Sequence, residues 1–385
     1  MKIEQCDVLI IGAGPSGSVA AALLMQQGRK VLILEREQFP RFSIGESLLP
    51  QSMEYIQQAG MLQVVVEAGF QYKNGAAFVR GDSYTDFDFR DKHSVGWGTN
   101  YQVQRATFDH LLAKEAQRQG AEIRFQHTVI SVDVESEKPT VVARDIDGVE
   151  YTVEAGFILD ASGFGRVLPR LLDLETPSNF PVRGAIFTHI EDGTAATDFD
   201  RNKIRITVHP EYCHVWYWLI PFSGGRCSIG VVAETSFLEK YKGSDTERLH
   251  ALVMEDPASR ELLKNAKWDT PARSITGYSA NVKSLWGKNY ALLGNAGEFL
   301  DPVFSSGVTI AVKSASMAAA VLQRHFAGIA VDWENEYAVP LKKGVNTFRT
   351  FVESWYRGGF QQVIFYENQP PEIRCKIAAI LAGYA

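Results

Sequence analysis

The sequence predicts an α/β protein. A Rossmann-type βαβ unit opens the chain, an antiparallel β-sheet is inserted in its middle, and helices end it. Residues 6–36 show a buried apolar run, a glycine-rich turn, an amphipathic helix and a second apolar run. Between about residues 181 and 275 apolar and polar residues alternate, as in half-buried strands. From about residue 307 apolar residues recur at helical spacing.

Composition sets the class of protein. The chain has 385 residues, 45% of them hydrophobic and 22% charged, an ordinary balance for a folded protein of two domains. A net charge of −6 shows no basic surplus, so we expect neither nucleic acid nor a membrane surface as a partner. No apolar run reaches the ~18 residues that span a bilayer. The four cysteines and eight histidines lack metal-ligand spacing, and the N-terminus lacks a leader pattern. We therefore expect a reduced, cytoplasmic protein without a metal site.

The first element is CDVLIIGAGPSGSVAAALLMQQGRKVLILER, which reads as strand, helix and strand. Gly12, Gly14 and Gly17 form G-x-G-x-x-G directly after the first strand, where glycines allow a tight turn and close approach of backbone to a pyrophosphate. That anion would lie at the helix N-terminus. Glu35 ends the second strand, at the spacing of a ribose-binding carboxylate. The pattern predicts a dinucleotide site but does not choose between FAD and NAD.

The following elements alternate between helix and strand. LLPQSMEYIQQAGM (48–61) and ATFDHLLAKEAQRQG (106–120) predict helices, and AEIRF (121–125) predicts a strand. In FQYKNGAAF (70–78), Asn74-Gly75 between aromatic-rich runs predicts a two-residue β-hairpin turn, with Lys73 beside it. KIRITVH, CHVWYWLIPF and RCSIGVVA predict the inserted sheet, and VTIAVKSASMAAAVLQRHFAG (308–328) predicts a long helix.

Two later segments favour FAD by resemblance. FILDASGFGR (157–166) and YALLGNAGEFLDP (290–302) resemble the two further FAD-contacting motifs of glutathione-reductase-like and hydroxybenzoate-hydroxylase-like flavoproteins. Asn295 stands where that family more often has aspartate. Arg105 fits an arginine near the cofactor phosphates, and an exposed first-turn arginine explains it equally well. The resemblance implies FAD bound by Gly12, Gly14, Gly17, Glu35, Arg36, Ser47, Arg105, Asp160, Gly294, Asn295 and Asp301.

A narrower resemblance rests on four segments in order. WYWLIP (216–221) matches W-x-W-x-I-P, which is similar to the signature of flavin-dependent halogenases. FSIGESLLP (42–50), DPVFSSGV (301–308) and FQYKNGAAF resemble the segments that this family places near the flavin, the isoalloxazine and the catalytic lysine. Alone, Trp216 and Trp218 would be two aromatics on one face of a half-buried strand.

In that family, reduced FAD and O₂ oxidise chloride or bromide to hypohalous acid, which a lysine presents to an aromatic substrate. The resemblance implies Lys73 as this catalytic lysine, against the alternative of a solvated lysine beside a turn. Its aromatic surroundings would lower its pKa and favour a nucleophilic amine. Backbone N–H groups of Ser306 and Gly307 would bind the halide at a helix N-terminus. Glu46, Trp216, Trp218, Phe304 and Ser305 would surround the flavin and substrate.

Phe304 narrows the range of expected substrate classes. Tryptophan halogenases carry a glutamate at the matching position, so an apolar residue argues against free tryptophan and favours a pyrrole or phenol ring. The SSG variant and the terminal IAAILAGYA resemble pyrrole or phenol halogenases whose substrate is a thioester on an acyl or peptidyl carrier protein. Reduced FAD would come from a separate flavin reductase. A docking patch for the acidic carrier is conceivable at Lys342, Lys343, Arg349 or Arg357, which as ordinary solvated helix charges need no partner.

Together these patterns predict a discontinuous FAD-binding domain of residues 1–79, 96–180 and 276–330 and a substrate-binding sheet domain of residues 80–95 and 181–275. A helical segment, 331–385, ends in the apolar CKIAAILAGYA without a stop signal, which suggests truncation. A reductase or dehydrogenase like the geranylgeranyl reductases, a monooxygenase of the same fold, and a non-catalytic flavin-binding protein remain alternatives. Aromatics that could line a ring pocket, each also explained as plain core, are Tyr72, Phe78, Trp97, Phe187 and Trp355.

Overall fold

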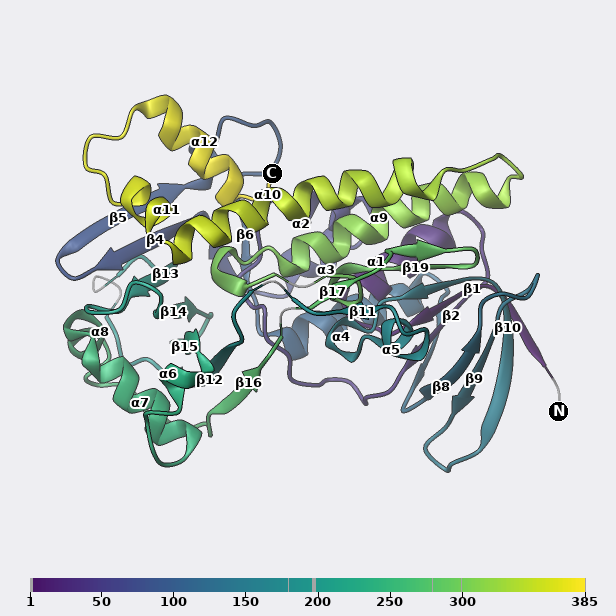
Figure 1. Ribbon diagram of the computed structural model, residues 1–385, viewed down its shortest axis with the longest axis horizontal. Helices are drawn as coiled ribbons and strands as arrows, with labels where there is room; N and C mark the ends of the chain where they lie inside the picture. Colours follow the sequence, from purple (N-terminus) through teal and green to yellow (C-terminus); the bar gives the residue numbers. More distant parts are fainter. Residues whose placement is uncertain (1–2, 179, 196–198, 279, 299, 385) are drawn as a thin grey trace.

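The computed structural model describes residues 3–178, 180–195, 199–278, 280–298 and 300–384. In this part of the chain the larger sheet has eight strands, and Figure 1 shows it on the side of the molecule where the N-terminus lies. Its main path is β18 (Trp286–Gly287), β19 (Tyr290–Leu292), β10 (Glu150–Asp160), β1 (Glu4–Ile11), β2 (Val31–Glu35) and β7 (Glu122–Phe125). The hairpin of β8 (Thr128–Asp133) and β9 (Thr140–Arg144) joins it at β10.

The centre of this sheet is the predicted βαβ unit. β1 pairs in parallel with both β10 and β2, and Val8 to Ile11 are buried, as expected for a strand covered on both faces. Helix α1 (Pro15–Gln26) begins directly after the glycine turn and packs against α4 (Arg105–Arg118) and α9 (Gly307–Phe326). The predicted helices at 106–120 and 308–328 are thereby confirmed. The helix predicted over 48–61 is present as the shorter α2 (Ser52–Gln58), followed by α3 (Leu62–Glu67).

The second sheet confirms the inserted antiparallel region. Its order is β16 (Arg273–Thr276), β12 (Arg183–Glu191), β15 (Arg226–Glu234), β14 (Trp216–Pro221), β13 (Lys203–Val208), β4 (Gly75–Arg80) and β5 (Ser83–Asp88). Only the β13–β4 pair is parallel among the described strand pairs of this sheet. Because β4 belongs to it from its first residue, the sheet crosses the boundary expected between residues 79 and 80.

Strand β14 shows how the two faces of this sheet are used. Trp216, Trp218 and Ile220 point into the core shared with the larger sheet. Tyr217 and Leu219 point the other way, into a separate core covered by α6 (Thr235–Leu238), α7 (Asp245–Glu255) and α8 (Pro257–Leu262). Strand alternation therefore directs the two tryptophans toward the half of the molecule that contains the larger sheet.

The hairpin predicted at Asn74-Gly75 is wrong. β3 (Gln71–Lys73) pairs with β6 (Asn100–Gln102), whereas β4 pairs with β13 and β5, so the chain passes from one sheet to another at this dipeptide. Gly75 is required here for a different reason than a turn. A Cβ at this position would lie 2.2 Å from the carbonyl oxygen of Phe87.

Helices form the C-terminal part, as expected. α10 (Val339–Tyr356) follows a π-helical turn at Glu334–Ala338 and lies alongside α9, and α11 (Gly359–Ile364) and α12 (Pro371–Leu381) cover the edge formed by β4 and β5 (Figure 1). The shorter elements are α5 (Val167–Leu171), β11 (Glu175–Thr176), β17 (Asn281–Val282) and 3₁₀ turns at Phe89–Asp91, Gly163–Gly165, Gly294–Ala296 and Pro302–Phe304. Within the described residues, no helix is both long and apolar enough to cross a bilayer.

Candidate active site

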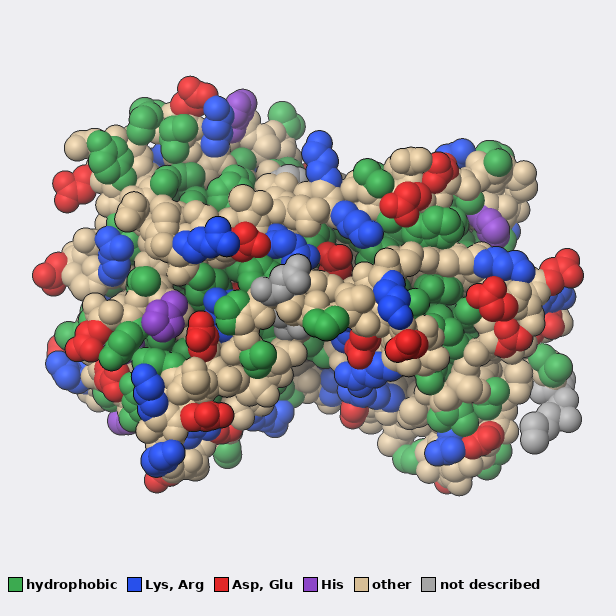
Figure 2. All heavy atoms as spheres, viewed as in Figure 1, with side chains coloured by type: hydrophobic (Ala, Val, Ile, Leu, Met, Phe, Trp, Pro, Cys, Tyr) green, Lys and Arg blue, Asp and Glu red, His purple; other side chains and the backbone are tan. Residues whose placement is uncertain are grey.

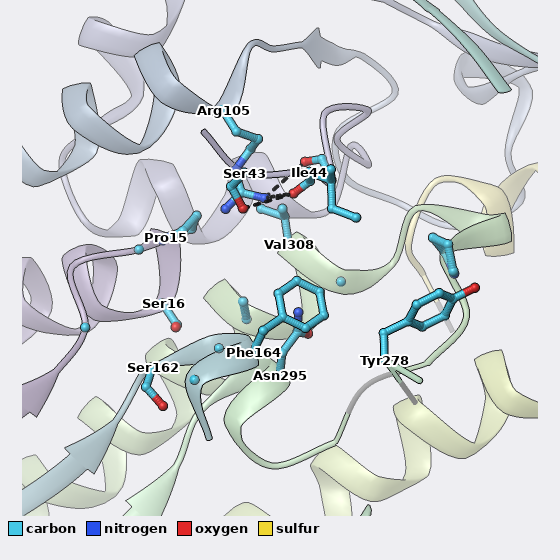
Figure 3. A pocket seen from close by; sticks show the side chains of 18 of the residues that line it. Pro15, Ser16, Ser43, Ile44, Arg105, Ser162, Phe164, Tyr278, Asn295 and Val308 are labelled. Atoms are coloured by element: carbon cyan, nitrogen blue, oxygen red, sulfur yellow. Dashed lines mark hydrogen bonds between the residues drawn. The ribbon is translucent and has the colours of Figure 1, made fainter. Parts of the chain in front are cut away.

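A cavity of about 610 Å³ lies between the carboxyl end of the parallel strands and the tryptophan face of β14. Figure 3 shows its walls, with Pro15 and Ser16 of α1, Ser162 and Phe164 after β10, and Asn295 and Val308 from the last third of the chain. The open α/β sheet therefore presents its ligand site where such sheets generally do, at the carboxyl ends of its strands. Within the described residues, no group of histidine, cysteine, aspartate and glutamate could hold a metal ion.

The glycine turn at one end of the cavity has no room for side chains. Gly12 has a φ of +99°, and a Cβ there would lie 2.7 Å from the carbonyl oxygen of Ala161. A Cβ on Gly17 would lie 2.0 Å from the carbonyl oxygen of Gly12, so this glycine allows the turn and α1 to pack closely. Gly12 and Gly14 line the cavity. The turn of Gly12, Gly14 and Gly17, the glycine cradle, therefore has the tight backbone geometry that a phosphate-binding glycine fingerprint requires.

Glu35 and Arg36 line the same end of the cavity. The Glu35 carboxylate accepts hydrogen bonds from the backbone N–H groups of Ala13 (2.8 Å) and Glu37 (2.9 Å). It is fixed at the end of β2, close to the cradle. The Arg36 side chain is 60% exposed and lies 3.4 Å from the carboxylate of Glu37.

Arg105 lines the cavity, but it is not an exposed first-turn residue, because only 8% of it is accessible. Its guanidinium donates to both carboxylate oxygens of Asp109 (2.7 and 2.9 Å) and to the carbonyl oxygen of Ile44 (Figure 3). Arg41, which the sequence analysis did not single out, also donates to Asp109 (2.8 Å) and lines the cavity. A Cβ on Gly14 would lie 3.6 Å from the Arg41 guanidinium, so Asp109 holds two cations near the cradle.

Three predicted cofactor residues do not line the cavity: Gly17, described above, and Asp160 and Gly294. Asp160 is fully buried, and its carboxylate accepts the backbone N–H groups of Ser162 (2.9 Å) and Leu168 (2.7 Å). Its pKa is raised, chiefly by burial. Gly294 is buried against α9, where a Cβ would lie 2.9 Å from Ala311. Asp160 and Gly294 shape loops that carry lining residues, Ser162 and Asn295 respectively.

Asp301 lines the cavity and is held by a hydrogen-bonded chain. Its carboxylate accepts from the Tyr356 hydroxyl (2.7 Å) of α10 and from the Tyr278 hydroxyl (3.4 Å). Tyr356 in turn accepts from the indole N–H of Trp216 (2.9 Å). Burial raises the pKa of the Asp301 carboxyl, and burial together with that carboxyl raises the pKa of Tyr356. Neither Tyr278 nor Tyr356 carries a sequence motif that would have indicated this contact.

Trp216 and Trp218 both line the cavity, with ring centroids 6.0 Å apart. The Trp218 indole N–H donates to the Ser228 hydroxyl (3.0 Å) of the neighbouring strand. Every ring N–H of this pair is therefore satisfied, and the two faces form a fixed apolar wall opposite the glycine cradle.

The DPVFSSGV segment turns at the start of α9. Ser305, Ser306 and Gly307 line the cavity, and Ser305 adopts a left-handed backbone with φ of +55°, a conformation that non-glycine residues seldom adopt. N–H groups in the first turn of the 20-residue helix α9 have no carbonyl partner within the helix. Phe304 points elsewhere and does not line the cavity. Its ring meets the rings of Trp355 (6.0 Å) and Phe360 (5.5 Å) edge to face.

Lys73 is fully buried, and this excludes the alternative of a solvated lysine beside a turn. Its Nζ donates to the Ser47 hydroxyl (2.7 Å) and the Leu48 carbonyl (2.6 Å), and lies 5.2 Å from the centre of the Phe89 ring. Burial lowers its pKa from 10.5 to about 7. Ser47 lines the cavity whereas Lys73 does not, so one side chain separates the amine from the cavity.

The segment that carries Ser47 is tied to the second sheet. Glu46, a lining residue, hydrogen-bonds to His189 of β12 (2.6 Å). Phe42, also lining, stacks on Phe187 (5.9 Å, 7° between planes) and under the guanidinium of Arg273 (4.4 Å). Phe187, Phe78 and Trp355 are core residues that do not line the cavity, Trp97 is half-buried, and Tyr72 is exposed.

These walls suit FAD. The cavity is long enough to reach from the glycine cradle and its two arginines to the tryptophan wall. One end offers N–H groups and cations for phosphates, and the other offers flat apolar surface for a ring system. Residues placed to hold it are Gly12, Gly14, Glu35, Arg36, Arg41, Arg105, Asn295 and Asp301.

Comparisons with known proteins agree with this geometry. The model of the FAD-binding-domain family matches residues 5–333. A 1H-pyrrole-2-carbonyl peptidyl-carrier-protein chlorinase of Pseudomonas fluorescens is 29% identical, over 100% of this chain and 90% of the relative. A flavin-dependent halogenase of Armillaria mellea is 30% identical, over 85% of this chain and 69% of the relative.

Among solved structures, a flavoprotein/dehydrogenase of Cytophaga hutchinsonii superposes with a TM-score of 0.96 at 42% identity, covering 99% of this chain and 93% of that one. The family model covers most of the chain, and a halogenase matches at 30% identity over more than two thirds of both partners. The chain therefore belongs to the FAD-binding-domain family and, within it, to the flavin-dependent halogenases.

Proposed function

We propose that this halogenase places chlorine or bromine on an electron-rich ring, a pyrrole or a phenol, and that Lys73 carries the halogen to it. The observation that carries the proposal is the state of the Lys73 amine. It is buried, its pKa is lowered to about 7, and it lies one side chain behind the cavity wall. Bound FAD, reduced by a separate flavin reductase, would use O₂ to supply the oxidising power that converts halide to hypohalous acid.

The halide is expected at the start of α9. Backbone N–H groups of Ser306 and Gly307 are the donors available there, and the helix dipole favours an anion. The strained backbone of Ser305 fixes the turn that aims them. Asp301 steadies the other side of this turn, since its carboxylate accepts the Val303 N–H (3.2 Å). The burial that raises its pKa favours the neutral acid, which would not repel a halide.

Lys73 then takes the halogen. In its neutral form the amine has two N–H donors, and Ser47 and Leu48 occupy both. The lone pair is left to attack the halogen of hypohalous acid. The N–halogen bond forms, the O–halogen bond breaks, and the leaving hydroxide takes one amine proton to become water. When the ring carbon attacks the halogen, the N–halogen bond breaks and Nζ recovers a proton from the ring.

We infer the substrate class from Phe304, which stands where tryptophan halogenases carry a glutamate. Its ring packs on Trp355 and offers no carboxylate to help remove the ring proton. A ring that accepts electrophilic halogen without such help, such as a pyrrole or phenol, fits better than an indole. The relative from Pseudomonas fluorescens acts on a pyrrole-2-carbonyl group attached to a peptidyl carrier protein. We propose the same kind of tethered substrate here, in the cytoplasm.

The carrier would dock near the C-terminal helices. Arg349 is paired with Glu298 (3.2 Å), and Arg357 lies 3.8 Å from Glu353, so neither cation is unpaired. On the face seen in Figure 2, basic and acidic side chains are interspersed. We therefore assign at most Lys342 and Lys343 to a docking patch.

The experiment is mass spectrometry of products from the protein with FAD, a flavin reductase, NADH, O₂ and bromide. The substrates are free and carrier-tethered pyrroles and phenols. Wild type is expected to give a bromine isotope doublet. Lys73→Ala is expected to form at least 100-fold less brominated product than wild type while still oxidising reduced flavin. The matched control is Lys376→Ala, at an exposed lysine, which should form as much product as wild type.

Two results would count against the proposal. Product formation that persists in Lys73→Ala would remove the lysine from the reaction. Halide-independent reduction or hydroxylation of the substrates by wild type would instead favour the reductase, dehydrogenase or monooxygenase alternatives.

A further inference from the structure

The polar groups around Lys73 are not all satisfied. Asn100 is only 2% exposed, and neither its Oδ1 nor its Nδ2 has a hydrogen-bond partner among the residues that the structure describes. The Oε1 atom of Gln102, which is 1% exposed, likewise has no hydrogen-bond partner among the described residues. Buried polar atoms are nearly always paired, and an exception calls for a physical explanation.

Strand register places Asn100 beside Lys73. The two residues face each other directly in the antiparallel β3–β6 pair, so their side chains lie on the same face with Cβ atoms about 5 Å apart. On the other side of β6 runs the segment of Ser47 and Leu48, joined to it by the Leu48 N–H to the Tyr101 carbonyl (3.2 Å) and by a bridge between Ser47 and Gln102. To reach Ser47 and Leu48, the lysine side chain must cross β6 where Asn100 stands.

A carboxamide is suited to this place. It offers an N–H donor and a carbonyl acceptor on one planar group and adds no charge next to a buried amine. The step proposed for Lys73 releases hydroxide from hypohalous acid inside the protein. A leaving oxygen in such a dry place requires a hydrogen-bond donor, since an unpaired charge there is costly.

From this juxtaposition we propose that Asn100 is a further catalytic residue, which binds the oxygen of hypohalous acid and holds its halogen against Nζ of Lys73. This inference rests on the proposed function. The Nδ2–H group donates to the departing oxygen, and Oδ1 accepts from the hypohalous acid O–H. The bonds made and broken are those of the step proposed for Lys73. One N–halogen bond forms, one O–halogen bond breaks, and water leaves.

The juxtaposition itself is tested without turnover. Protein carrying ¹³Cε-labelled lysine is titrated by NMR, with the Lys73 signal assigned from its loss in Lys73→Met. Asn100→Asp puts a carboxylate beside the amine and is expected to raise the pKa of Lys73 by at least one relative to wild type. Asn346→Asp, at an exposed asparagine, should leave it unchanged. An unchanged Lys73 pKa in Asn100→Asp overturns the proposal.

The role is tested by a single turnover without substrate. Protein loaded with reduced FAD is mixed with O₂ and bromide and desalted, and the oxidising bromine retained on the protein is counted by oxidation of iodide. Wild type should retain an amount close to one equivalent and Lys73→Met almost none. Asn100→Leu should retain at least tenfold less than wild type and release the difference as hypobromous acid, trapped by a β-diketone. Asn346→Leu should match wild type.

The outcomes separate the two claims. Wild-type retention by Asn100→Leu, with or without a loss of product on a real substrate, overturns the role of Asn100 and leaves the halogenase proposal standing. Because Asn100→Leu removes unpaired buried polar atoms, it should unfold at the wild-type temperature or above, which excludes misfolding as the cause of a loss. Absence of any oxidised bromine from wild type overturns the proposed function, and with it the role of Asn100.

Discussion

At the scale of the residue, burial changes the protonation of the Lys73 amine. Outside the fold its amine would be charged at neutral pH, with a pKa near 10.5. Inside it, no carboxylate is bonded to the amine within the described chain, and Ser47 and Leu48 supply neutral acceptors. Burial is therefore the cause of the lowered pKa, and the amine is largely neutral at slightly alkaline pH.

This gives a stability prediction with a definite sign. Between pH 7 and about 10.5 the unfolded chain holds a proton on Lys73 that the folded protein has lost, so stability should rise with pH across this range. The slope from this group is about 1.4 kcal/mol per pH unit in the free energy of unfolding. Lys73→Met, which cannot titrate, should be more stable than wild type near pH 7 and lose that advantage by pH 10. Urea unfolding at both pH values measures this, and a constant difference would contradict it.

The pH profile of bromination follows from the same group. Product formed per flavin oxidised should increase through about pH 7 and level off above it, because only the neutral amine has a lone pair. Product yield and flavin oxidation, measured together from pH 5.5 to 9, separate this effect from changes in flavin chemistry. A yield that falls with rising pH in this window would exclude the neutral amine as the acceptor.

At the scale of elements, the candidate halide turn is held by contacts from α10 and β14. Tyr356 ends α10, and its hydroxyl links Asp301, at the start of the DPVFSSGV turn, to Trp216 of β14. One hydroxyl thus joins a helix, a 3₁₀ turn and a strand. The position of Ser306 and Gly307 depends on all three elements.

Tyr356→Phe keeps the ring and removes this link. It should lower the free energy of unfolding by about 1–2 kcal/mol, the range for a hydrogen bond lost in the interior. It should also raise the bromide concentration needed for half-maximal bromination at least fivefold, with little change in FAD affinity. Tyr366→Phe, at a 59% exposed tyrosine, is the control. A loss of stability with unchanged bromide dependence would limit Tyr356 to a structural role.

Local pattern predicted some of these elements and missed others for a physical reason. The glycine cradle, α9 and the inward face of β14 follow from spacing within a few residues. Asn74-Gly75 failed as a hairpin because the partners of β3 and β4 are distant strands, which no local signal encodes. Arg41, Asn100 and Tyr356 were missed for the same reason. Their roles depend on Asp109, Lys73 and Asp301, which only the folded chain brings near.

At the scale of the whole molecule, the chain passes at Gly75 from the sheet of β3 and β6 into the sheet that contains β4, and we call this passage the crossing. Lys73 belongs to the two-stranded sheet of β3 and β6, and two residues later the chain enters the seven-stranded sheet that contains β4. Gly75→Ala would drive a methyl group into the Phe87 carbonyl, 2.2 Å away, and should cost at least about 2 kcal/mol in the free energy of unfolding.

Gly344→Ala is the matched control for Gly75→Ala. A Cβ there would lie 3.8 Å from the Lys313 Nζ, and an alanine inside α10 should stabilise by up to about 1 kcal/mol. Both variants are compared by thermal unfolding and by bromination per flavin oxidised. Equal stability of Gly75→Ala and wild type would contradict the tight crossing.

Because the Ser47 side chain separates the Lys73 amine from the cavity, the two halves of the proposed reaction can occur at different times. If oxidation of halide and its use on a substrate occur on opposite sides of that side chain, the two events need not coincide. The protein could be charged with halogen before a substrate arrives and remain charged between encounters with a scarce substrate. Turnover would then be limited by the supply of substrate, and the lifetime of the charged protein would set how sparse that supply can be.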